Sequence, residues 1–147
     1  MKRAFVLVSA IAAAGIVATV GSAGHAERSG ALHVMKECSK YFGHVGEFCT
    51  IKSSNIPAIE PEMNVFYLAA LPPSGVLDSD IVLSSGHGGG ALGHVVLDGS
   101  TAQGRVSFSV GTGRFAGFHA RAVVSVDSSG LWHWDGTYRF SRSDDDD

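Results

Sequence analysis

Residues 111–117 read GTGRFAG, and they are followed by FHARAVVSV at 118–126 and WHWDGTYRF at 132–140. Three glycines among seven residues predict a tight connection, because glycine readily adopts positive φ angles. Both following stretches alternate between two faces, which predicts half-buried antiparallel strands. The face expected to be buried carries Phe118, Ala120, Ala122, Val124, Val126, Trp132, Trp134, Tyr138 and Phe140.

Shorter stretches of strand character precede this hairpin. Residues 32–38 fit either a strand or a helix, because both periodicities are present there. Turn signals such as Pro72-Pro73-Ser74-Gly75 separate the stretches. Seven or eight short antiparallel strands indicate an all-β sandwich or barrel, and closure into a barrel would remove the exposed edges. The earlier predicted strands are 48–53, 64–71, 80–84, 91–97 and 104–110.

The string GTGRFAGFHARAVVSV with the following WHWDGTYRF resembles the C-terminal half of the allene oxide cyclase barrel, a fold shared with dirigent proteins. The similarity covers residues 78–140, and Val110 stands where the family often has the first glycine of its turn. The resemblance implies a single antiparallel β-barrel of about seven to eight strands. It also implies that an apolar or phenolic molecule is bound in the barrel and guided through cyclisation or coupling.

The chain of 147 residues is long enough for one domain. Lys2 and Arg3 precede an apolar run from residue 5 to 20, and small residues lead to Ala26, which is the pattern of a cleaved signal peptide. A retained membrane anchor is the alternative. We therefore expect a signal peptide at 1–26, a barrel domain at 27–143 and an acidic, solvated tail at 144–147.

Two cysteines are present, Cys38 and Cys49. In an exported protein an even pair predicts a disulfide, which would place the mature chain in the periplasm or outside the cell. Two free thiols or a catalytic cysteine are the alternatives.

Several partners and cofactors find no support in the sequence. Without the signal peptide and the four terminal aspartates the chain is nearly neutral, which argues against nucleic acid. The glycines of the 111–117 turn have the wrong spacing for a dinucleotide-binding site. The stretch His87-Gly88-Gly89-Gly90 resembles the oxyanion loop of esterases, but the sequence lacks the nucleophile elbow that such a loop needs. The histidines lack metal-site spacing. We expect no cofactor, no metal and no membrane contact after cleavage, and homo-oligomerisation stays open.

The polar face of the last two strands offers the candidate acid–base residues His119, His133 and Asp135. If this face lined a cavity, a histidine beside a carboxylate could transfer protons. If it faces water, as in an ordinary half-solvated sheet, these side chains form only surface ion pairs.

The aromatic residues Tyr67, Phe118, Trp132, Trp134 and Tyr138 are the candidate ligand-binding residues, because they are expected to line the barrel. The leading hypothesis is a small-molecule-binding barrel, with isomerase or cyclase activity if it is an enzyme. The alternative is a non-catalytic structural or interaction module with a filled core. A hydrolase or a metalloprotein is a third hypothesis, weakened by the missing motifs.

Overall fold

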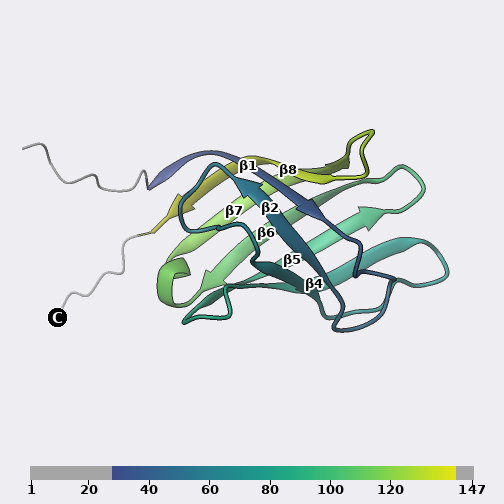
Figure 1. The fold of residues 1–147 in the computed structure, drawn as a ribbon, viewed down its shortest axis with the longest axis horizontal. Coiled ribbons are helices and arrows are strands. Elements are labelled where there is room, and N and C mark those ends of the chain that lie inside the picture. The colour runs from purple at the N-terminus through teal and green to yellow at the C-terminus, as the bar shows by residue number, and fades with distance from the viewer. Residues whose placement is uncertain (1–27, 142–147) are drawn as a thin grey trace, which may run out of the picture.

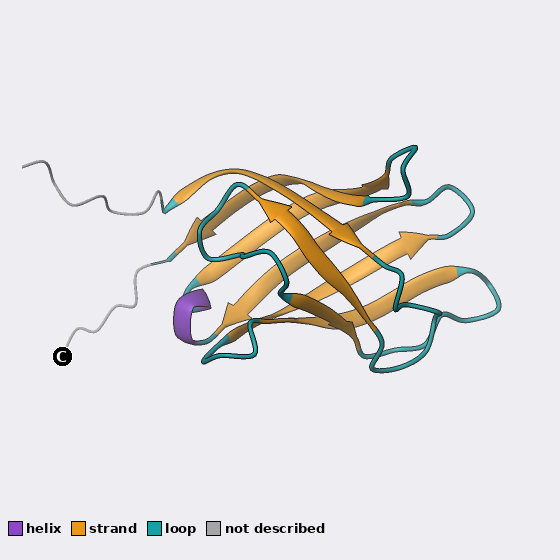
Figure 2. Ribbon diagram, viewed as in Figure 1, coloured by secondary structure: helices purple, strands orange, loops and turns teal. Residues whose placement is uncertain are grey.

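The computed structural model describes residues 28–141. The predicted signal peptide at 1–26 and the predicted tail at 144–147 lie outside the described residues. The described part of the chain forms an antiparallel sheet that closes into a barrel (Figures 1 and 2). Its strands are β1 (Ser29–Glu37), β2 (Phe48–Ser54), β3 (Asn64–Tyr67), β4 (Val76–Ser84), β5 (Gly90–Asp98), β6 (Gln103–Gly111), β7 (Phe118–Val126) and β8 (Trp132–Phe140).

The topology is up-and-down, since each strand pairs with its neighbours in sequence and β8 pairs with β1. The start of β1, the end of β8 and a short 3₁₀ helix, η1 (Gly113–Phe115), share the end of the barrel that lies on the left in Figure 1. We call the opposite end the far end. It is formed by the loops 38–47, 68–75, 99–102 and 127–131. The predicted all-β barrel is confirmed, and residues 32–37 of the stretch 32–38 belong to β1.

The glycine-rich turn is built around a buried phenylalanine. Phe115 is fully buried, and its ring packs edge-on against Phe118 at 5.6 Å between centroids. Gly117 has φ of +76°, which glycine adopts without strain. At Gly111 a Cβ atom would collide with the carbonyl oxygen of Phe115. The turn therefore closes the end of the barrel where β1 starts and β8 ends.

Two predicted strands differ from the observed ones by four residues at one end. The stretch 64–71 ends as a strand at Tyr67, and Leu68 and Leu71 are exposed rather than covered. The stretch 80–84 is longer, because β4 starts at Val76 and pairs with β5 along its whole length. The extension is hard to predict because Ser79, a polar residue, occupies one of its inward positions and is buried there.

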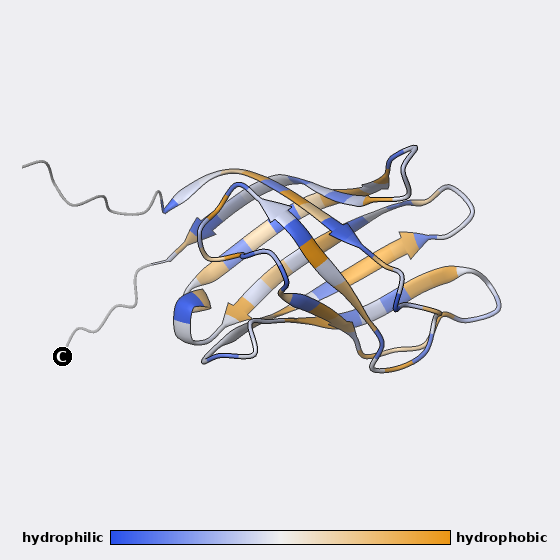
Figure 3. Ribbon diagram, in the orientation of Figure 1, coloured by the Kyte–Doolittle hydropathy of each residue, from blue (hydrophilic) through white to orange (hydrophobic). Residues whose placement is uncertain are grey.

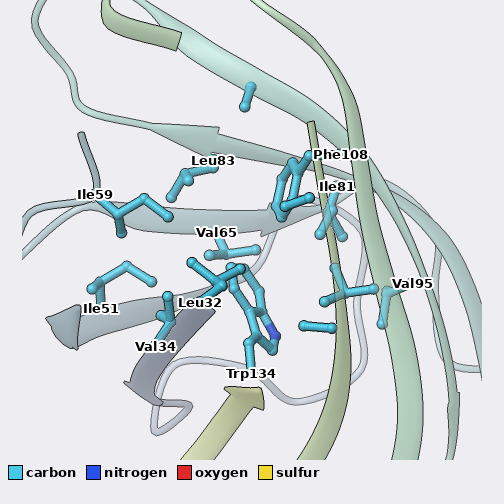
Figure 4. Packing of buried hydrophobic residues seen from close by; sticks show 14 of the residues in the cluster. Leu32, Val34, Ile51, Ile59, Val65, Ile81, Leu83, Val95, Phe108 and Trp134 are labelled. Carbon is cyan, nitrogen blue, oxygen red and sulfur yellow. The ribbon is translucent and has the colours of Figure 1, made fainter. Parts of the chain in front are cut away.

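The core fills the interior of the barrel. Along the strands hydrophilic and hydrophobic residues are interspersed (Figure 3), as expected when one face is buried and the other solvated. In Figure 4 the side chains of Leu32, Val65, Ile81 and Phe108 point toward Trp134, whose indole is 1% exposed. The Phe108 and Trp134 rings lie 5.5 Å apart. The expectation that Trp134 faces inward is confirmed.

The predicted disulfide is also confirmed: Cys38 and Cys49 are bonded to each other. It connects the chain just after β1 to the second residue of β2 and closes the 38–47 loop at its base. Cys49 is buried, while Cys38 is half-buried. Closing such a loop contributes about 2–3 kcal/mol to stability.

Substitution of Trp134 tests which face is the core. Trp134→Ala should lower the free energy of unfolding by roughly 3–5 kcal/mol, the usual cost of deleting a large buried aromatic side chain. His133→Ala should cost under about 1 kcal/mol, because the imidazole lies on the outer face. Urea unfolding of both variants measures the two values. A stable Trp134→Ala protein beside a severely destabilised His133→Ala protein would contradict the assignment.

Candidate functional site

The candidate site centres on a lysine inside the barrel. Lys36 is 3% exposed and is the only buried charged residue among residues 28–141. It follows Leu32 and Val34 on the inward face of β1, and a register shift before it places it opposite Ile51 on β2. On the other side it pairs with Trp132 on β8. The same alternation that builds the core therefore carries this amine into the lumen.

Polar and aromatic groups surround the Lys36 amine. Its Nζ atom lies 2.5 Å from the hydroxyl oxygen of Tyr67 and 5.3 Å from the centroids of both the Tyr67 and the Trp134 rings. The disulfide is close as well, with Cys38 Sγ at 3.9 Å from Nζ and Cys49 Sγ at 3.5 Å from the Tyr67 hydroxyl. No carboxylate in the described part of the chain pairs with this lysine. The ammonium form is thus stabilised only by dipoles and ring faces.

Burial shifts the proton equilibria of these groups. Loss of hydration disfavours the ammonium form, and it lowers the pKa of Lys36 to about 7. Burial also raises the pKa of the Tyr67 phenol. It is the main cause that raises the pKa of Tyr41 to about 12. At neutral pH the site therefore combines an amine that is partly unprotonated with two phenols that keep their protons.

A small cavity lies against the amine at the far end of the barrel. Its volume is about 50 Å³. The Tyr41 ring stacks on Tyr67 at 4.5 Å and forms part of the cavity wall. The Tyr41 hydroxyl is buried and has no hydrogen-bond partner among the described residues. The cavity is lined by Lys36, Cys38, Tyr41, Cys49, Tyr67, Leu77, Val95, Leu97, Val124 and Trp132.

Buried polar groups are normally hydrogen-bonded, so an unsatisfied phenol at a cavity indicates room for a polar partner there. A cavity needs roughly 10–15 Å³ to hold one water molecule. The space beside Lys36 thus fits a few non-hydrogen atoms. Cys38, Tyr41, Leu97 and Trp132 in its lining are only partly buried, so the cavity lies next to the protein surface.

The loops next to the cavity expose apolar side chains, which we call the apolar rim: Phe42, Val45, Leu68 and Leu71. The two loops that carry them are joined through backbone hydrogen bonds, from Leu71 N–H to the Gly43 carbonyl at 2.9 Å and from Gly46 N–H to the Tyr67 carbonyl at 2.7 Å. Phe42 is 74% exposed. An apolar molecule resting here would cover surface that now faces water.

The structure brings three of the five predicted ligand-binding residues to the candidate site. Tyr67 and Trp132 line the cavity, and Trp134 contacts the amine from the side of the core. Phe118 lies at the opposite end of the barrel, beside η1, where it packs against Phe115. Tyr138 is buried near Phe140, toward the end of β8 and therefore also away from the candidate site.

The three predicted acid–base residues lie on the outer face of the barrel and do not meet. His133 Nε2 lies 2.7 Å from a carboxylate oxygen of Asp127. Asp135 lies 2.8 Å from His33 Nδ1. His119 is opposite Arg139 in the sheet, away from both. These residues therefore belong to the solvated polar face, which was the alternative to a cavity lining.

Sequence reasoning missed Lys36 and Tyr41. A signal for Lys36 is present, since a lysine occupies the inward position between Val34 and Cys38 in an otherwise apolar alternation. Tyr41 gives no such signal, because it lies in an irregular loop, where no period tells which way a side chain points. Residues 28–141 contain no group of three metal-ligating side chains, and no helix there is long and apolar enough to cross a membrane.

Comparisons with protein families, with curated proteins and with solved structures found no match for this chain. The chemistry of the candidate site thus depends on its own residues: a buried amine, two phenols, a cavity and an apolar rim.

Lys36→Met should stabilise the protein near neutral pH. A pKa lowered from 10.5 to about 7 corresponds to a cost of roughly 5 kcal/mol at pH 7 and below. The variant also loses the contacts of Lys36 to Tyr67 and Trp134, so it should recover only part of this cost. We expect a gain in the free energy of unfolding of at least about 1 kcal/mol. Between pH 7 and 10 the unfolded state binds more protons at this residue, so wild-type stability should rise with pH relative to the variant.

Urea unfolding of both proteins at several pH values measures this difference, and the exposed Lys40→Met serves as the control. A difference between wild type and Lys36→Met that stays constant from pH 7 to 10 would contradict a lowered pKa at Lys36.

Proposed function

We propose that this protein is an exported barrel that binds a small molecule at its far end, with an oxygen atom of the ligand beside Lys36. The observation that carries the proposal is the burial of an amine without a carboxylate partner in the described chain, at a cavity shared with an unsatisfied phenol. A buried cation that lacks an ion-pair partner is costly to the fold. Perturbed groups of this kind cluster at functional sites.

The site favours a ligand with a small polar head and an apolar body. A phenol or an enol fits, because its hydroxyl can donate a hydrogen bond to the neutral Lys36 amine and its oxygen can accept a hydrogen bond from Tyr41. Only the head fits into about 50 Å³. The body would extend over the apolar rim of Phe42, Val45, Leu68 and Leu71. This ligand class agrees with the apolar or phenolic molecules that the resemblance to the allene oxide cyclase barrel implies.

The same groups would support an isomerisation. A general base works best when its pKa lies near the operating pH, and Lys36 meets this condition. In a carbonyl compound the amine would remove a proton from the carbon next to the carbonyl. The phenols of Tyr41 and Tyr67 would donate hydrogen bonds to the developing enolate oxygen. Return of the proton at another position would complete the reaction without a cofactor.

Two features support export. The Cys38–Cys49 disulfide fits an oxidising compartment. The first 26 residues have the composition of a signal peptide, although they lie outside the described residues.

One observation favours the second candidate, a non-catalytic module with a filled core. Ligand pockets for drug-sized molecules usually measure about 300–1,000 Å³, and the cavity beside Lys36 is far smaller at about 50 Å³. In this alternative Lys36 is a tolerated defect of the core, and the partner surface lies outside the barrel.

Titration with phenol distinguishes the two candidates. Both tryptophans of the chain lie at the site, so intrinsic fluorescence reports on binding there. We expect phenol to change the emission saturably at pH 7, and Lys36→Met to weaken its binding at least ten-fold, because the variant lacks the amine that accepts the hydrogen bond of the phenol. Cyclohexanol, which has a similar size but no acidic proton, should bind more weakly than phenol.

Lys40→Met is the matched control, since it removes an exposed lysine from the same end of the barrel. Lack of saturable binding, or equal binding by wild type and Lys36→Met, would instead support the filled-core module.

A further inference from the structure

We propose that Lys36 captures short-chain aldehydes of two to three carbon atoms as an imine. The inference rests on the proposed function, because it assigns a second and covalent ligand chemistry to the same site. It differs from that function in requiring nucleophilic attack by the amine rather than proton transfer.

The placement of the amine suits an attack on a carbonyl carbon. Lys36 Nζ is held between the Tyr67 and Trp134 rings at 5.3 Å from each centroid, and it borders the cavity directly. In the described chain no carboxylate pairs with this amine and would have to be displaced. A desolvated lysine in an apolar pocket is a recognised way to obtain a nucleophilic amine.

The volume sets the size of the aldehyde. A cavity of about 50 Å³ holds a few non-hydrogen atoms, given the roughly 10–15 Å³ that one water molecule needs. The apolar part of the lining, Leu77, Val95, Leu97 and Val124, would contact the short alkyl group. Larger aldehydes would have to displace Tyr41 or Trp132.

The reaction balances without an oxidant or a reductant. The nitrogen lone pair forms an N–C bond as the C=O π bond breaks, and the carbonyl oxygen gains a proton as the nitrogen loses one. The C–O bond of this carbinolamine then breaks while the C=N bond forms. The second nitrogen proton leaves with the oxygen as water. One amine and one aldehyde thus give one imine and one water.

Two phenols are placed to move these protons. Tyr67 lies 2.5 Å from Nζ and can accept a proton from the nitrogen while donating its own. Tyr41 has a buried hydroxyl without a partner in the described structure, and it shares the cavity with the amine. It can donate a hydrogen bond to the carbonyl oxygen and then protonate the leaving hydroxide. Tyr41 is therefore assigned as the acid that helps water leave.

Reductive trapping tests the inference. The whole protein is treated briefly at pH 7 with acetaldehyde and cyanoborohydride, which converts an imine into a stable ethyl group, and the sites are quantified by peptide mass spectrometry. We expect Lys36 to be labelled at least ten-fold faster than Lys40 and Lys52, which are both exposed. Burial lowers the pKa of Lys36 to about 7, so at pH 7 a far larger fraction of its amines is neutral than for an exposed lysine.

Two controls connect the labelling to the site. Unfolding in urea should abolish the preference for Lys36, because the preference depends on burial. Tyr41→Phe keeps the ring that stacks on Tyr67 and removes only the hydroxyl, so it should slow Lys36 labelling several-fold and leave Lys40 labelling unchanged. Circular dichroism verifies that this variant is folded.

The outcomes separate this inference from the proposed function. Phenol binding that depends on Lys36, together with Lys36 labelling no faster than that of Lys40, would overturn aldehyde capture and leave the proposed function standing. Preferential Lys36 labelling supports aldehyde capture even if phenol does not bind. Preferential labelling that persists in urea would overturn it, because the reactivity would then be a property of the local sequence.

Discussion

The pairing of β8 with β1 is the contact on which the rest of the structure depends. It joins residues about a hundred positions apart, in a register that runs from Ser29 opposite Arg139 to Lys36 opposite Trp132. Such a contact is reached only after considerable chain entropy has been lost. In return it converts an open sheet with two edges into a barrel without edges. The His33–Asp135 pair, at 2.8 Å, joins the same two strands on the outside.

Closure also determines the environment of Lys36. In an open sheet the amine at the end of β1 could turn toward water, as lysine side chains usually do. In the barrel Trp132 and Trp134 from β8 and Tyr67 from β3 surround it. The fold thus creates a desolvated amine as a by-product of strand pairing. Apart from Ser79, the buried side chains of the described residues are otherwise apolar or aromatic, so Lys36 is the one buried charge among them.

Much of the fold could be predicted from the sequence, because alternation is a local signal. The strands at 118–126 and 132–140 were predicted with their observed bounds, and the inward position of Trp134 follows from the same period. Errors arose where an inward residue is polar, as at Ser79 in β4. The candidate site was harder to predict, because it needs long-range information. The sequence places Lys36 on the inward face but does not show that Tyr67, Trp134 and the Tyr41 loop converge on it.

The disulfide closes the loop that forms one wall of the cavity. Tyr41 lies in the loop that the Cys38–Cys49 bond closes, and both sulfur atoms border the cavity. Before the thiols are oxidised, only hydrogen bonds and the ring contact between Tyr41 and Tyr67 would hold this loop against the barrel. A chain with reduced cysteines would therefore lack the covalent closure of this wall. If the protein is exported as we propose, the bond that closes the Tyr41 loop would form only after the chain has reached a compartment where thiols oxidise.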